Sequence, residues 1–313
     1  MMILKCICAI VTRVLFIILS LIGIWRVTQV KDDNRFWCLS LLCLLLVVEM
    51  IVSLRRRKGK DYRWFSPAIL LFLITIIPSM WILEIDHQQN RNNDPQCVKL
   101  HSWEDVKNMI SSNETAANGM LHIISMNAGK LASSVCADDW ILGLHQFLLI
   151  LLILGKWLLP LGGGVTRDEL SQQLLIFVGT AADILEFTNE TLSDVKENSP
   201  ELVYIILAVW TWSTLQFLHQ LAVVSPEESL EAGSDSLLSR RSTDVWSIME
   251  SLFIQDGPFL VVRLVVLIHY EIFHLMLLFF TLKNSLALIL NLYRLYVIYH
   301  DYKRKSNIRN NYF

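Results

Sequence analysis

The chain carries, in its C-terminal third, the stretch Phe253-Ile254-Gln255-Asp256-Gly257-Pro258-Phe259-Leu260-Val261-Val262-Arg263. It places an acid, a glycine-proline break and a base inside residues 244–270, which are otherwise mostly apolar. A run of this length can cross a bilayer, where both ionisable residues and broken helices are costly. We therefore interpret the stretch as part of a membrane-spanning helix that is broken near its middle.

The composition supports a membrane protein. Of the 313 residues, 54% are hydrophobic and 18% are charged, and the mean hydropathy is +0.46, whereas ordinary soluble domains carry about a quarter charged residues. The apolar residues fall in blocks of helical length without strand-like alternation, so we expect an all-α, polytopic bundle of about eight transmembrane helices. The predicted spans are residues 6–27, 36–54, 65–85, 140–161, 170–187, 202–224, 244–270 and 272–298.

Residues 1–313 are expected to form a single multi-pass domain with one long polar loop at 86–139. This loop holds amphipathic patterns, so we expect a small helical extracellular cap between the third and fourth spans. It contains an N-glycosylation sequon at Asn113 and two cysteines, Cys97 and Cys136, which can form a disulfide if the loop is lumenal. Residues 225–243 are expected to be a cytoplasmic connector, and residues 299–313 a cytoplasmic tail.

The distribution of basic residues predicts the orientation. The densest basic run is Arg55–Arg63, between the second and third spans, and such runs remain on the cytoplasmic side. With eight spans, both termini are then cytoplasmic, in the plasma membrane or the secretory pathway. The same run can contact anionic lipid headgroups. The net charge of -2 indicates no nucleic-acid partner, and nothing in the sequence identifies a protein partner.

Several motifs, in this order, resemble the transmembrane protein 26 family. They are Gly23-Ile24-Trp25-Arg26-Val27-Thr28, Tyr62-Arg63-Trp64-Phe65-Ser66-Pro67-Ala68-Ile69, Trp157-Leu158-Leu159-Pro160, Gly162-Gly163-Gly164-Val165-Thr166-Arg167-Asp168, residues 177–187 and residues 253–263. The resemblance implies a multi-pass membrane protein of a family with no established biochemical activity. It supplies no catalytic residues and no cofactor.

Three bases inside predicted spans, Arg13, Arg263 and Lys283, each have an acid at a similar depth on another span. A rise of about 1.5 Å per residue gives three candidate pairs: Arg13 with Glu49, Asp183 with Arg263, and Asp256 with Lys283. An unpaired charge at mid-bilayer costs about 3 kcal/mol on insertion scales, so such pairs can be purely structural. Glu186 lies near the outer interface, and we expect it to be solvated.

The glycine-proline break gives a functional interpretation of the same residues. Pro258 has no N–H, so the carbonyl of Ile254 loses its helical partner. That carbonyl, the carboxylate of Asp256 and the amide of Gln255 would form a cation site of the kind found at discontinuous transporter helices. Arg263, Asp183 and Lys283 would belong to the same polar site.

Two classes of function remain open from the sequence. The first is a transporter or channel-like protein with its site at the broken seventh helix. The second is a non-catalytic structural, adaptor or receptor-like surface protein. We expect no enzyme, because the sequence shows no nucleophile elbow and no paired-histidine motif. We also expect no metal site, because no CxxC pair occurs and Cys6 and Cys8 are too closely spaced for zinc.

Overall fold

The computed structural model describes residues 2–57, 65–90, 136–159, 167–191, 200–218, 245–246 and 248–310. Every regular element in this part of the chain is a helix. Eight of the helical segments are long and apolar enough to cross a membrane. The predicted all-α, eight-span fold is therefore confirmed.

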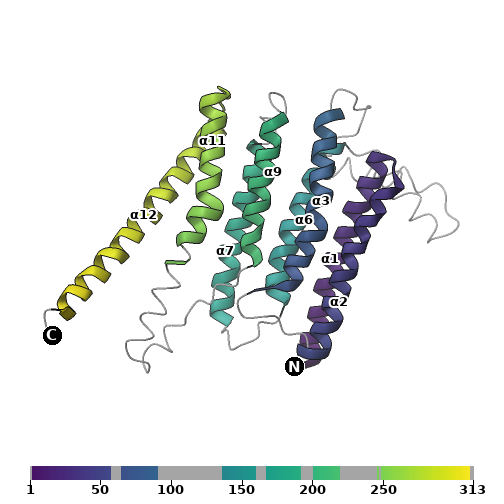
Figure 1. The fold of residues 1–313 in the computed structure, drawn as a ribbon, viewed down its shortest axis with the longest axis horizontal. Coiled ribbons are helices and arrows are strands. Elements are labelled where there is room, and N and C mark those ends of the chain that lie inside the picture. The colour runs from purple at the N-terminus through teal and green to yellow at the C-terminus, as the bar shows by residue number, and fades with distance from the viewer. Residues whose placement is uncertain are drawn as a thin grey trace, which may run out of the picture.

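The N-terminal half is a compact group of four spans (Figure 1). Its elements are α1 (Met2–Lys31), η1 (Asn34–Leu39), α2 (Ser40–Arg57), α3 (Pro67–Asn90) and α6 (Ala137–Leu158). Helix α1 packs against α2, α3 and α6. A Cβ added to Gly155 of α6 would lie 2.7 Å from Cζ of Phe16, so the glycine permits the close approach of α1 and α6. Small residues have this role at many helix contacts in membranes.

The C-terminal half supplies the other four spans. Its elements are α7 (Arg167–Glu186), η3 (Phe187–Thr191), α9 (Pro200–Thr214), η4 (Leu215–Leu218), η6 (Ser251–Asp256), α11 (Gly257–His269) and α12 (Leu275–Asn310). Elements η3 and η6 are π-helical turns, and η4 is a 3₁₀ turn. Figure 1 shows α11 and α12 at one end of the row of helices, with α12 diverging from α11 along its length.

Two helices extend well beyond the spans predicted from hydropathy. Helix α1 continues to Lys31, and α12 continues to Asn310, because hydropathy marks the apolar part of a helix and not its end. Helix α3 begins at Pro67, in the first turn, where a proline is tolerated. It continues as one helix through Pro78, so this internal proline does not terminate it.

The two termini lie at the same end of the bundle, where both are marked at the lower edge of Figure 1. This arrangement follows from an even number of spans. The C-terminal end of α2, which carries Arg55 and Arg56, lies at that end as well, as does the end of α12 with Lys303 and Arg304. The described basic residues near the C-terminal ends of α2 and α12 therefore belong to one side of the membrane.

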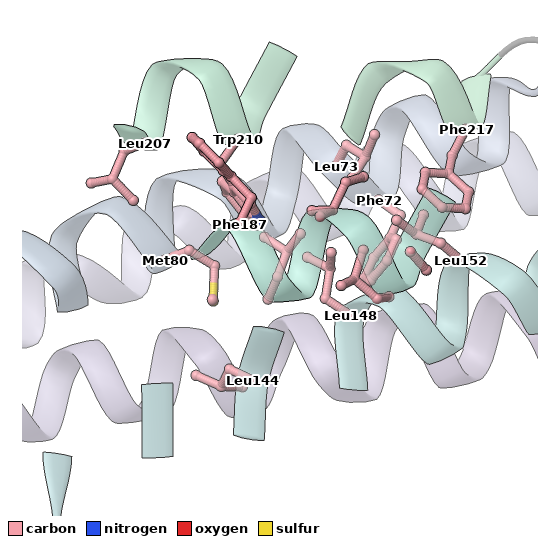
Figure 2. Packing of buried hydrophobic residues seen from close by; sticks show 14 of the residues in the cluster. Phe72, Leu73, Met80, Leu144, Leu148, Leu152, Phe187, Leu207, Trp210 and Phe217 are labelled. Carbon is pink, nitrogen blue, oxygen red and sulfur yellow. The ribbon is translucent and has the colours of Figure 1, made fainter. Parts of the chain in front are cut away.

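The buried core lies between α3, α6, α7 and α9 (Figure 2). Trp210 is fully buried at its centre, and Phe72, Leu148 and Leu152 contribute to the same cluster. Stacked aromatic pairs link neighbouring helices. These pairs are Phe16 with Phe72, Phe177 with Phe217, and Phe187 with Phe259. Since lipid is as apolar as a side chain, such close packing is a main source of helix association in membranes.

The outermost helices expose apolar side chains along much of their length. On α2 these include Leu41, Leu44 and Val48, and on α12 they include Leu282 and Ile289. A helix that faces hydrocarbon is expected to show this pattern. The apolar surface of α2 and α12 is thus consistent with direct contact with the bilayer.

A charged cluster between helices α7, α11 and α12

Helix α7 ends with two carboxylates on one face. Asp183 and Glu186 are three residues apart, and side chains with this spacing are neighbours on a helix. Lys283 of α12 donates from Nζ to Oδ1 of Asp183, and its Nζ lies 3.7 Å from Oε2 of Glu186. Arg263 of α11 donates from Nη2 to Oε1 of Glu186. Two ion pairs therefore join the α11–α12 hairpin to α7.

Aromatic rings enclose the cationic side of this cluster. The guanidinium carbon of Arg263 lies 5.5 Å from the ring centroid of Phe187 and 5.4 Å from that of Phe280. Nζ of Lys283 lies 5.7 Å from the centroid of Phe280. Arg263 is 1% exposed, and Glu186, the carbonyl of Phe280 and the faces of the two rings stabilise its buried charge. A desolvated cation over an aromatic ring gains up to about 2 kcal/mol.

The glycine-proline motif produces a π-helical turn in place of the expected break in regular backbone. In η6, the N–H of Gly257 bonds to the carbonyl of Leu252, five residues back. The carbonyl of Phe253, which an α-helix would pair with Gly257, instead accepts a bond of 3.1 Å from Nε1 of Trp212 on α9. Pro258 then occupies the first turn of α11, where a missing N–H is tolerated.

Gly257 is required by the geometry of this turn. A Cβ at this position would lie 2.2 Å from the carbonyl oxygen of Leu252, which is far inside van der Waals contact. π-Helical turns inside α-helices are frequently located at functional sites. The glycine-proline motif therefore marks an irregular helical segment, as expected. The irregularity is a π-helical turn, and not the open break in the helix that was expected.

Asp256 lies at the end of the π-turn and is 8% exposed. Its Oδ2 accepts a bond of 2.5 Å from Oγ of Ser251, and that hydroxyl accepts a bond of 3.0 Å from Nδ2 of Asn291 on α12. The neighbouring Gln255 donates from Nε2 to Oδ2 of Asp183 at 3.0 Å. Hydrogen bonds thus connect the π-turn to both α7 and α12.

The cluster has more acids than bases. Asp183, Glu186 and Asp256 are three carboxylates, and Arg263 and Lys283 are two cations that pair with the first two acids. Among the described residues, Asp256 forms no ion pair, although Asp183 and Lys283 are close enough to act on it electrostatically. With every group ionised, the cluster has one net negative charge, and that charge is centred on a buried carboxylate.

The partners of three predicted residues differ from those expected. Arg263 pairs with Glu186 and not Asp183, and Lys283 pairs with Asp183 and not Asp256. Glu186 is therefore an ion-pair partner, and the expectation that it is solvated is wrong. Asp183 and Glu186 are about 4.5 Å apart in depth, and a long arginine side chain can reach either of them. Residue counting cannot resolve that difference.

The structure also brings together Arg13 of α1 and Glu49 of α2, as the depth argument expected. Nε and Nη2 of Arg13 donate to the two carboxylate oxygens of Glu49 at 2.7 and 2.8 Å. Further bonds run from Nη1 to the carbonyl of Ala9 at 3.1 Å and from Nη2 to Oγ of Ser53 at 3.1 Å. This bidentate pair lies on the first two spans, in the N-terminal half, and is distinct from the charged cluster.

A second cluster of polar residues lies at the end of the bundle opposite the termini, where α1 and α3 end and α6 begins. Nζ of Lys31 lies 2.6 Å from Oδ1 of Asp86, and Nε2 of His87 lies 2.8 Å from Oδ1 of Asp138. These residues were not predicted as site residues, because polar side chains are common at the ends of membrane spans. They link three helices at the base of the long polar loop.

Several predicted residues lie outside the described part of the chain. These are Asn113, Cys97, most of the 86–139 loop, residues 58–63 of the basic run and the 225–243 connector. Cys136 is disulfide-bonded, but its pairing with Cys97 remains a prediction. In the described residues, no group of three or more His, Cys, Asp or Glu side chains is placed to hold a metal ion.

Polar side chains of α12 belong to the site, although they were not among the residues predicted for it. Thr281, Asn284 and Asn291 are spaced by three and seven residues, so they share one face of the helix. Asn291 contacts Ser251, and Asn284 is 2% exposed. Their spacing in an apolar span was a usable signal.

This architecture, with eight apolar helices and charges held between them, defines a multi-pass α-helical membrane protein. A family model described as Transmembrane protein 26 matches residues 3–294. The match covers nearly the whole chain, and the protein therefore belongs to the transmembrane protein 26 family, in agreement with the resemblance seen in its motifs. No solved structure matches the chain.

Proposed function

We propose that the protein is a transporter or channel-like protein whose polar site is the charged cluster at η6. The observation that carries this proposal is the excess of buried acid. Asp256 is 8% exposed in the seventh span, and the two cations of the cluster are engaged by other carboxylates. Ionisable residues inside a membrane are costly, and they commonly mark ion or substrate pathways.

The π-turn supports the same proposal. A purely structural span would be expected to complete its helical hydrogen bonds, whereas here Trp212 supplies a bond to the carbonyl of Phe253 from another helix. Irregular helices at membrane depth recur at the binding sites of transporters, where they line the site. We further propose that the protein is not an enzyme, since the polar groups of the charged cluster in the described part of the chain form ion pairs and amide contacts without an activated nucleophile.

A non-catalytic surface protein is the alternative. The paired charges favour it, because Arg13 with Glu49, Arg263 with Glu186, and Lys283 with Asp183 can all serve helix association alone. In that case the partners would bind outside the bundle. The two proposals differ in the role of Asp256, which forms no ion pair with another helix in the described part of the chain.

Transport is tested by reconstituting the full chain in liposomes. Uptake of radioactive sodium and rubidium, and proton flux reported by a pH-sensitive dye, should exceed that of empty liposomes. Asp256→Asn should reduce this uptake to the level of empty liposomes while leaving the amount of reconstituted protein unchanged. Glu201→Gln, which alters an exposed carboxylate of α9, should retain it. No flux of any of these ions by wild-type protein would favour the surface-protein alternative.

We also propose that the end of the bundle with both termini is cytoplasmic, in the plasma membrane or the secretory pathway. Arg55, Arg56, Lys303 and Arg304 are exposed at that end, and basic residues remain cytoplasmic. This end can also contact anionic lipids through the run that begins at Arg55.

The orientation predicts that Asn113 is lumenal and glycosylated. Treatment of the protein from cells with an N-glycosidase should increase its gel mobility, and Asn113→Gln should migrate like the treated wild type. Asn189→Gln is the matched control, because its sequon begins inside η3 and is too close to the membrane for efficient modification. Wild-type protein whose mobility does not respond to the glycosidase would contradict the orientation.

A further inference from the structure

Building on the transport function above, we propose that Asp256 binds one monovalent alkali-metal cation, together with oxygen ligands from the π-turn and from Asn284 of α12. A buried carboxylate with no cation beside it is strongly unfavourable in a membrane. In the described structure, Arg263 and Lys283 are held by Glu186 and Asp183. One added positive charge would neutralise the cluster.

The opposing helix supplies a second observation. Asn284 is 2% exposed, and its Nδ2 has no hydrogen-bond partner among the described residues. A buried polar group without a partner is rare in folded proteins and marks a missing water, ion or ligand. The amide lies on the same face of α12 as Asn291, which bonds to the π-turn.

Two contacts place Asn284 close to Asp256 along the helix pair. Helices α11 and α12 are antiparallel neighbours (Figure 1). Nη1 of Arg263 donates to the carbonyl of Phe280, and Nδ2 of Asn291 donates to Ser251. Asn284 lies between Phe280 and Asn291, while Asp256 lies between Ser251 and Arg263. The same segment of the interface therefore contains both the unpaired carboxylate and the amide without a partner.

The available ligands suit an alkali-metal cation. Asp256 contributes one carboxylate, and Ser251, which donates to it, contributes a hydroxyl oxygen; the proposed site adds the amide carbonyls of Gln255 and Asn284. A half-turn of the Asn284 side-chain amide exchanges Nδ2 for Oδ1 at nearly the same place, which presents an oxygen to the cation. Hard cations prefer oxygen ligands, and a single uncompensated carboxylate matches one positive charge.

Cation binding is tested on the purified full chain by thermal unfolding in detergent. The midpoint is measured in sodium, potassium and N-methyl-D-glucamine chloride at equal ionic strength. We expect sodium or potassium to raise the midpoint by several degrees relative to the bulky cation, with saturation, because a ligand that binds only the folded state stabilises it. Asp256→Asn should remove the difference between the salts, whereas Glu201→Gln should retain it.

Asn284→Leu provides an independent test of the second ligand. It should raise the concentration of cation for half the midpoint shift by about tenfold, as expected for the loss of one supporting ligand. An unchanged half-saturating concentration would overturn the role of α12. Equal midpoints in all three salts for the wild type would overturn the site, as would a salt response that persists in Asp256→Asn. A wild type stabilised only by acid would make the occupant a proton and overturn the alkali-metal assignment.

The outcomes for this site and for transport are separable. A salt-specific midpoint shift without ion flux in liposomes would support the cation site and overturn the transport function. Ion flux without a salt-specific shift would support transport and overturn the cation site. Both assays use the same purified protein, so differences in folding do not confuse the comparison.

Discussion

Glu186→Gln is expected to lower the free energy of unfolding by about 3–5 kcal/mol, the usual cost of removing one partner of a buried ion pair. Arg263 is 1% exposed and enclosed by Phe187 and Phe280, so its guanidinium would remain buried without a carboxylate. Glutamine retains the volume of glutamate, and the loss therefore reports the charge. The measurement is unfolding by sodium dodecyl sulfate in mixed micelles, followed by circular dichroism.

The exposed Glu201 provides the matched control. Glu201→Gln makes the same chemical change on α9, where the side chain is exposed, and should alter the free energy of unfolding by less than about 0.5 kcal/mol. Combining Glu186→Gln with Arg263→Met should restore much of the stability, because the unpaired buried charge is then removed. A single variant as stable as the wild type would show that the Glu186–Arg263 pair does not hold the α11–α12 hairpin.

The second large effect is expected at the N-terminal ion pair. Glu49→Gln should cost about 3–5 kcal/mol, because Arg13 is fully buried and both of its bonds to Glu49 are lost or weakened. Only Ala9 and Ser53 would then remain as described partners of the guanidinium. The same micelle unfolding assay measures the loss.

This pair should be replaceable, because buried ion pairs can often be exchanged for apolar residues at little cost. Arg13→Met combined with Glu49→Leu should unfold within about 1 kcal/mol of the wild type. A double variant as unstable as Glu49→Gln would contradict a purely structural role for the pair. Its predicted stability also makes the double variant a suitable control for ion flux, since it removes intramembrane charge away from the α7–α11–α12 cluster.

Hydropathy predicted the number of spans better than it predicted where the helices end. Apolar blocks predicted eight spans, and the structure contains eight segments that qualify, since the thickness of the bilayer constrains length and composition together. The ends of α1 and α12 were less well predicted, because Lys31 and residues near Asn310 are polar and still helical. Helix ends depend on capping and packing that hydropathy does not report.

Pairing acids and bases by their depth in the membrane predicted the correct partner where only one acid was within reach of the base. Arg13 had one candidate, Glu49, and the two are joined in the structure. Near α7, the carboxylates of Asp183 and Glu186 are one turn apart, and Lys283 approaches both of them. The sequence could place these residues in one cluster, but the choice among partners depends on helix rotation and on side-chain reach.

The π-turn shows a further limit of sequence analysis. Gly257 and Pro258 predicted an irregularity at the right position, yet its form depends on Trp212, which is 41 residues from Phe253 in the chain. The partner of a displaced carbonyl is a tertiary contact, and no local pattern identifies it. The spacing of Asn284 and Asn291 on one face of α12 is visible in the sequence, whereas the bond from Asn291 to Ser251 of the π-turn is a tertiary contact.

The most direct test of the account is ion flux into liposomes, measured side by side for three proteins reconstituted in equal amounts. These are the wild type, Asp256→Asn, and the Arg13→Met/Glu49→Leu double variant. We expect sodium or rubidium uptake by the wild type and the double variant, and none above empty liposomes for Asp256→Asn. Uptake by Asp256→Asn equal to that of the wild type would contradict the account.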